Sequence, residues 1–186
     1  MKAQNILNIS FFILLIFIGL FSCQDSNKKQ FLEEINQMQA QLNEFDSLAN
    51  QHRVDTLNLI INEIKQRTKE VAEVYSPDTI DYEIAEMMNA YKESRKALSS
   101  NSGNLAKVRQ SIPEVRLALE NLAHDIEHGI GPREKYEEFI LFESGKLHQI
   151  EEILNYYIET KEKYMKMYLE NNVKVIAFIE ELKASN

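Results

Sequence analysis

The feature that most constrains this chain is its shortage of glycine and proline. There are five glycines and three prolines in 186 residues. Neither residue occurs between Gly19 and Pro77, and neither follows Gly145. Both residues interrupt helices and build turns, so stretches this long without them favour long helices and argue against a strand-and-turn protein. We therefore expect an all-α fold.

The overall composition excludes several classes of protein. Hydrophobic residues make up 44% and charged residues 27%, which is ordinary for a globular protein and argues against wholesale disorder. The net charge of −8 makes the chain a poor candidate for binding a phosphate backbone, so we expect no nucleic acid partner. The single cysteine excludes an intramolecular disulfide framework and a cysteine-rich zinc module.

The first 23 residues differ from the rest of the chain. Lys2 makes the beginning weakly positive, an apolar segment runs from Ile9 to Phe21, and the only cysteine, Cys23, follows. The apolar segment has the length of a signal-peptide core and is shorter than the roughly 20 residues that span a bilayer. The alternatives are an ordinary secretory signal and an uncleaved anchor that extends upstream past Asn8.

The segment resembles the signal peptides of bacterial lipoproteins, and Leu20, Ser22 and Cys23 carry this resemblance. In that class, a leucine and small residues precede a cysteine whose thiol is diacylglycerylated, and the amino group freed by cleavage is usually acylated too. Phe21 departs from the pattern, since a small residue is usual there. The resemblance implies a signal peptide of residues 1–22, lipidation of Cys23, and a short tether in residues 23–29.

The same resemblance implies a location in the cell envelope. Gln24 follows the cysteine, whereas an aspartate at that place favours retention in the inner membrane in such lipoproteins. We therefore expect attachment to the outer membrane, facing the periplasm. Removal of Lys2 with the signal peptide leaves the mature chain still more acidic, so the lipid chains rather than electrostatic attraction would hold it on the membrane.

From residue 30 onward, apolar residues recur at alternating spacings of three and four, which is typical of a helical seam. The step of five residues from Ala49 to Val54 shifts the register around Gln51–Arg53, and this predicts either a skip in one long helix or a short break. The first two seams consist of Phe31, Ile35, Met38, Leu42, Phe45 and Ala49, then Val54, Leu57, Ile61, Ile64, Thr68, Val71 and Tyr75.

Turn-forming residues divide the remainder of the chain. Ser76 and Pro77 have the order of an N-cap followed by the first residue of a helix. The polar run Ser99–Asn104 predicts a loop, and Gly129–Pro132 predicts the turn before a last helix that ends near Leu182. We expect the third helical region to be interrupted at Pro113, with the main helix beginning at about residue 112.

These lengths predict an antiparallel up-down helical bundle in a single domain of residues 30–186. Short loops make neighbouring helices antiparallel, so reversals at all predicted loops give a distal four-helix part on a longer two-helix, coiled-coil-like stalk. This fold puts Pro113 opposite Gly145, where we expect a shared bend. It also puts the junctions Tyr75–Thr79 and Gly129–Pro132 together at the tip away from the membrane.

Polar and aromatic residues in the last helix admit more than one interpretation. Lys161 and Asn171 stand where the seam expects apolar side chains, so they either fix the register of the helices or leave a gap for a partner helix. Tyr157 and Tyr168, together with Tyr164, keep the seam spacing, and we expect them in the core rather than in a ligand site. The adjacent Tyr156 is expected on the surface.

Two histidines form the one motif-like group. Residues 124–128 have the order His-x-x-Glu-His of inverted zincins, and a helix places His124 and His128 on one face. Those enzymes are much larger and use a distant third ligand, which this chain does not supply. A solvated helix end is the simpler interpretation, and a surface metal site completed by Glu134 or Glu138 is the alternative. His148 lies too far along the chain to join it.

No catalytic constellation, cofactor motif or glycine-rich phosphate loop is recognisable. We therefore expect a non-enzymatic, membrane-anchored scaffold, adaptor or accessory subunit, whose tip binds a protein through Arg133, Glu134 and Tyr136. The alternative is a metal-binding envelope protein that uses His124 and His128. A bundle that encloses a lipid or small hydrophobe, and pairing with a second copy of the chain, are left open.

Overall fold

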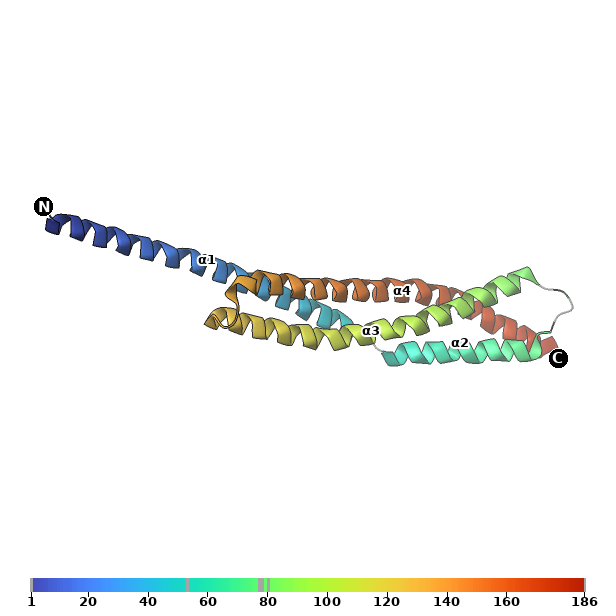
Figure 1. The fold of residues 1–186 in the computed structure, drawn as a ribbon. Helices are drawn as coiled ribbons and strands as arrows, with labels where there is room; N and C mark the ends of the chain where they lie inside the picture. The colour runs from blue at the N-terminus through green and yellow to red at the C-terminus, as the bar shows by residue number, and fades with distance from the viewer. Residues whose placement is uncertain (1, 53, 77–78, 80, 186) are drawn as a thin grey trace. The chain divides into compact units, whose positions relative to one another are not determined.

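The computed structural model describes the backbone of residues 2–52, 54–76, 79 and 81–185. These residues form four long helices and one short 3-10 helix, and the described part of the chain contains no strand (Figure 1). The all-α prediction is therefore confirmed. The elements are α1 (Lys2–Gln51), α2 (Val54–Val74), α3 (Tyr82–His128), η1 (Arg133–Lys135) and α4 (Tyr136–Ser185).

Side chains are described from residue 27 onward, except at residues 53–55, 77, 78, 80 and 186. The predicted signal peptide and the lipidation of Cys23 lie outside these residues. Within the part that the structure describes, no helix combines the length and the apolar character needed to cross a membrane.

The predicted register shift near residue 52 takes the form of a break, because α1 ends at Gln51 and α2 begins at Val54. Arg109 of α3 donates from its guanidinium to the carbonyl oxygens of Ala49 at 2.9 Å and His52 at 2.7 Å. The last carbonyls of a helix have no partner within the helix, so this arginine satisfies the end of α1.

The predicted loop at Ser99–Asn104 is wrong, because these residues lie in the middle of α3. Asn101 is only 2% exposed and donates its amide to the carbonyl oxygen of Tyr157 at 2.8 Å, so this polar residue belongs to the packed face of the helix. Leu98 and Leu105, on either side of it, are fully buried. The four-helix part on a two-helix stalk required a reversal here, and that arrangement is not confirmed.

The start of α3 also differs from the prediction. Asp81, rather than Ser76, caps the helix, since its carboxylate accepts hydrogen bonds from the backbone N–H groups of Glu83 at 2.9 Å and Ile84 at 3.2 Å. Pro77 lies outside the described residues. Helix α3 continues through Pro113, where the sequence predicted an interruption.

The chain divides into two compact units. Unit 1 comprises Met1–Asn43 and Pro113–His148, and it packs the described part of α1 against the end of α3 and the start of α4. Arg116 donates to the side-chain oxygen of Asn43 at 2.7 Å, and Lys28 donates to the carbonyl oxygen of Glu127 at 2.9 Å, so α1 and α3 are antiparallel here. Its buried apolar residues are Ile35, Met38, Leu42, Val115, Leu119, Leu122, Ile126, Tyr136, Ile140 and Leu147.

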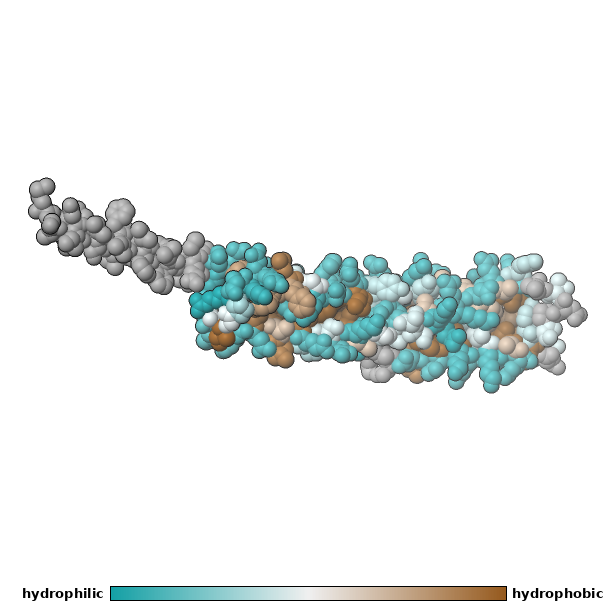
Figure 2. Space-filling view, viewed as in Figure 1, coloured by the Kyte–Doolittle hydropathy of each residue, from teal (hydrophilic) through white to brown (hydrophobic). Residues whose placement is uncertain are grey.

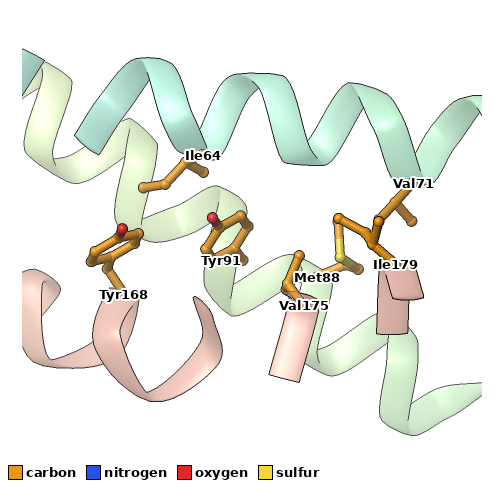
Figure 3. Packing of buried hydrophobic residues seen from close by; sticks show 7 residues of the cluster. All are labelled: Ile64, Val71, Met88, Tyr91, Tyr168, Val175 and Ile179. Carbon is orange, nitrogen blue, oxygen red and sulfur yellow. The ribbon is translucent and has the colours of Figure 1, made fainter. Parts of the chain in front are cut away.

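Unit 2 comprises Glu44–Ile112 and Gln149–Asn186. Its core is a cluster to which α2, α3 and α4 each contribute, and Figure 3 shows these side chains pointing toward one another. Tyr168 donates to Glu63 at 2.8 Å, and further along both helices Lys183 pairs with Glu70 at 2.6 Å, so α2 and α4 run in the same direction. The cluster consists of Ile64, Val71, Met88, Tyr91, Tyr168, Val175 and Ile179.

Candidate functional site

The turn between α3 and α4 is built by its glycines, as the sequence predicted. Gly129 has a φ of +64°, a left-handed conformation in which other residues are strained. The N–H of Ile130 donates to the carbonyl oxygen of Asp125 at 2.8 Å, and the N–H of Gly129 donates to that of Ile126 at 3.4 Å. This pair of bonds is the Schellman motif, which ends α3 with its last carbonyls satisfied.

Tyr136 stabilises this turn through its hydroxyl group. Its hydroxyl lies 2.7 Å from the carbonyl oxygen of Ile130 and 3.0 Å from that of Asp125, and the residue is 6% exposed. It is thus a positioning residue rather than the accessible partner contact that the sequence suggested. Arg133 and Glu134 are exposed, and Arg133 donates from Nε to the carbonyl oxygen of Gly129 at 3.1 Å.

A pocket of about 540 Å³ lies beside the turn, within unit 1. Lys28 reaches across it to the Glu127 carbonyl, so the beginning of the described part of α1 is held against the end of α3. Both signs of charge line the pocket, together with the rings of Phe31, His128 and Tyr136. Its lining residues are Asn27, Lys28, Phe31, Ile126, Glu127, His128, Gly129, Arg133, Glu134 and Tyr136.

The two histidines of the predicted metal alternative lie together. The rings of His124 and His128 have centroids 4.2 Å apart, and Nδ1 of His128 lies 2.8 Å from the carbonyl oxygen of His124. A carbonyl can only accept, so this nitrogen carries the proton and is not available to a metal. Among the described residues, no three His, Cys, Asp or Glu side chains are grouped so that they could hold a metal ion, so neither Glu134 nor Glu138 completes the site.

The two junctions that the sequence placed at one tip belong to different units. The segment Tyr75–Thr79 lies in unit 2, and Gly129–Pro132 lies in unit 1. Helix α3 begins after the first and ends before the second, so the shared tip is not confirmed. That prediction depended on the loop expected in the middle of α3.

A groove of about 590 Å³ lies between α3 and α4 of unit 2. Asn171 lines it, and its amide donates to the carbonyl oxygen of Met167 in the same helix at 2.8 Å. This contact does not tie two helices together, so the geometry favours the gap rather than the register interpretation for this residue. The groove is lined by Glu83, Ile84, Glu86, Met87, Ala90, Asn171, Lys174 and Phe178.

The neighbouring Asn172 does join helices, and the sequence analysis missed it. The hydroxyl of Tyr91 donates to its Oδ1 at 2.7 Å, and its Nδ2 lies 3.2 Å from the Tyr168 hydroxyl. Tyr168 in turn donates to the carboxylate of Glu63 at 2.8 Å, and Arg67 pairs with that carboxylate at 2.7 Å. The network links α2, α3 and α4. Asn172 directly follows Asn171, which occupies a seam position. Its place beside the seam was the only indication in the sequence that its amide could reach a neighbouring helix.

The pKa values in this network follow from its position in the core. Burial, followed by the hydrogen bond to Glu63, raises the pKa of Tyr168 to about 12, and burial also raises the pKa of Tyr91. Burial acts to raise the pKa of Glu63, but the hydrogen bond from Tyr168 and the charge of Arg67 outweigh it and hold that pKa below its usual value. The network therefore keeps neutral phenols beside one ionised carboxylate.

Lys161 has a different role from Asn171. Its Nζ donates to Nδ1 of His52 at 2.9 Å, at the break between α1 and α2. Burial, then the charges of Lys161 and Arg109, lower the pKa of His52, so the imidazole is neutral and can accept this bond. The edge of the His52 ring meets the buried ring of Tyr157. Lys161 thus makes the kind of interhelix contact expected of a register-fixing residue.

The tyrosines of α4 lie largely where the seam placed them. Tyr157 and Tyr168 are buried, and Tyr156 is exposed, as predicted. Tyr164 is only half-buried, and its hydroxyl donates to Glu93 at 3.2 Å. The tyrosines of the core therefore serve packing and the polar network.

Comparisons with known proteins do not assign the chain to a family. No protein-family model matches the chain, and no match was found among the curated proteins or among the solved structures.

Proposed function

We propose that this chain is a lipid-anchored, non-enzymatic adaptor of the bacterial cell envelope, which binds a protein partner in the α3–α4 groove of unit 2. The resemblance of Leu20, Ser22 and Cys23 to a lipoprotein signal supports the anchor, and Gln24 supports the outer membrane, facing the periplasm. In place of a four-helix part on a stalk, the adaptor would have an up-down-up arrangement within each unit: α1, α3 and α4 in unit 1, and the end of α1 followed by α2, α3 and α4 in unit 2. The observation that carries the partner site is the groove itself.

The apolar floor of this groove is the outer side of the unit 2 core. Ile84, Met87 and Phe178 pack against the buried cluster on one side and line the groove on the other. All three are only partly buried, so they retain apolar surface that a partner would cover. The volume of the groove accommodates several large side chains from the ridge of a partner helix.

The rim of the groove specifies the chemistry of that partner. Glu83 and Glu86 stand on the α3 side, and Lys174 stands on the α4 side. Complementary charges steer association and exclude wrong partners. The groove therefore fits an amphipathic helix that carries an apolar ridge, with basic side chains toward α3 and an acidic side chain toward α4. Asn171, in the wall, offers hydrogen bonds to a polar residue of that ridge.

Photo-crosslinking in intact cells tests the groove. A benzophenone amino acid replaces Asn171 in the full-length chain, and in a matched control it replaces the exposed Tyr156 of the same helix. We expect one dominant protein adduct from position 171 and none from position 156. The same adducts from both positions, or adducts with copies of this chain alone, would contradict the adaptor.

The anchor is tested separately with Cys23→Ser. The wild-type chain is expected in the membrane fraction with the mass of an acylated cysteine, whereas the variant is expected in the soluble fraction without that mass. Membrane association that survives the substitution unchanged would refute the lipid anchor while leaving the groove experiment intact.

A further inference from the structure

The turn between α3 and α4 lies beside Lys28, which follows the proposed lipid attachment at Cys23 closely in the chain. This inference rests on the proposed anchor at Cys23. Five residue steps separate Cys23 from Lys28, which is at most about 18 Å of fully extended chain. Lys28 contacts the carbonyl oxygen of Glu127 at 2.9 Å, two residues before Gly129. A lipid on Cys23 therefore brings this turn to the membrane surface.

The side chains at this end of unit 1 suit a lipid surface. Ile130, at the turn, is 48% exposed although it is apolar. Figure 2 shows brown, apolar residues beside teal ones at the end where the α3–α4 turn lies in Figure 1. Charges of both signs line the pocket beside the turn in equal number, whereas the whole chain has a net charge of −8. The cationic residues are Lys28 and Arg133, and the acidic ones are Glu127 and Glu134.

The backbone conformation of the turn at Ile130 is held by its neighbours. Gly129 and Gly131 have φ values of +64° and +82°, and the Tyr136 hydroxyl bonds the carbonyl of Ile130 itself. Arg133 donates to the Gly129 carbonyl, so its guanidinium stays beside the turn. A side chain held in this way loses little conformational entropy when it enters an interface.

We propose that the α3–α4 turn of unit 1 is a membrane-contacting surface. Ile130 enters the headgroup region of the bilayer, while Lys28, Arg133 and Lys135 meet lipid phosphates, in the manner of an apolar residue flanked by cations at a membrane interface. The pocket beside the turn, which carries both signs of charge, faces the headgroups. The lipid anchor and this surface together give unit 1 two attachments to the membrane instead of one.

A fluorescent reporter at Glu134→Cys tests this contact in the full-length, lipidated chain. Cys23 is the only natural cysteine and its thiol is consumed by the lipid, so the introduced thiol alone is labelled. The protein is bound to vesicles of phosphatidylethanolamine and phosphatidylglycerol that contain brominated acyl chains as quenchers. A matched reporter at Leu59→Cys stands on the exposed face of α2 in unit 2. We expect quenching at position 134 to be at least about threefold that at position 59.

Two further variants keep the outcomes distinct. Ile130→Asp, and separately Arg133→Glu combined with Lys135→Glu, are each expected to reduce quenching at position 134 by about half or more. Equal quenching at positions 134 and 59 in lipidated, vesicle-bound protein, or no effect of either variant, would overturn the membrane contact alone. A chain whose mass shows no lipid on Cys23 and that does not bind vesicles would overturn the anchor as well.

Discussion

The polar network in the core of unit 2 makes a quantitative prediction for Tyr91→Phe. Tyr91 is fully buried, and its hydroxyl donates to Asn172 at 2.7 Å. The substitution keeps the ring and removes only this donor, so the acceptor on Asn172 loses its partner inside the protein. An unsatisfied buried polar group costs about 1–3 kcal/mol. Because Asn172 is only half-buried, we expect the lower half of that range, about 1–2 kcal/mol.

The loss is measured by urea denaturation of the full chain in mild detergent, followed by circular dichroism. A loss of this size corresponds to a fall of about 2–8 °C in the midpoint of thermal unfolding for a chain of this length. Tyr156→Phe is the matched control, since Tyr156 is exposed on α4, and it should stay within about 0.5 kcal/mol of wild type. Hydrogen exchange of residues 82–101 assigns the loss to unit 2.

A double-mutant cycle isolates the pair. Asn172→Leu also breaks the contacts of Asn172 with Tyr168 and Glu63, so it alone should cost more than Tyr91→Phe. The two substitutions together should cost less than the sum of each, with a coupling of about 0.5–1.5 kcal/mol. Additive effects, or a Tyr91→Phe variant as stable as the Tyr156→Phe control, would refute the argument that this bond links α3 to α4.

Three further predictions concern the helix junctions. Gly103→Ala should stabilise the chain by about 0.5–1 kcal/mol in urea denaturation, because Gly103 lies inside a helix with open space around it, and a loss would contradict the continuous α3. Gly129→Ala should instead destabilise by about 1–2 kcal/mol in the same assay, because its φ is positive and a Cβ there would collide with the guanidinium of Arg133. The pKa of His52 is lowered in the folded state, so its bond from Lys161 adds stability that is present above pH 6.5 and is lost as the pH falls below it. In unfolding measured between pH 8 and pH 5, His52→Gln should reduce that dependence, and an unchanged profile would rule out this source.

Much of the helical structure could be predicted from apolar spacing and from glycine. The break near residue 52, the turn at Gly129 and the burial of most seam residues all follow from these two signals. They work because a packed helix must bury a continuous stripe, and because a left-handed residue at a helix end strongly favours glycine. The capping of α3 by Asp81 was missed because Ser76 and Pro77 carry a similar local signal five residues earlier. Local cap chemistry alone does not decide between two such sites.

The loop predicted at Ser99–Asn104 was wrong because the prediction gave more weight to the polar composition of this segment than to the helical spacing of the residues around it. From Tyr91 onward, buried residues follow one another at spacings of three and four without interruption, and Ser94 and Asn101 occupy two of these positions. Ser94 donates to the carbonyl of Ala90, and Asn101 bonds across to Tyr157, so both polar groups are satisfied inside the helix packing. Ser94 and Asn101 show that a polar residue in step with the seam can be a buried hydrogen-bonding residue instead of part of a loop.

The wrongly predicted loop also determined where the protein-binding site was expected. With a reversal at Ser99–Asn104, the turn at Gly129–Pro132 lies far from the beginning of α1, and Arg133 points toward a distant partner. Without it, α3 returns to the tether, and Lys28 contacts the last turn of the helix. The turn that carries the exposed Ile130 then lies beside Lys28, a short length of chain from Cys23, so its most direct partner is the bilayer that would hold the lipid. Protein binding is better assigned to the groove of unit 2, where apolar side chains stay partly uncovered between charged rims.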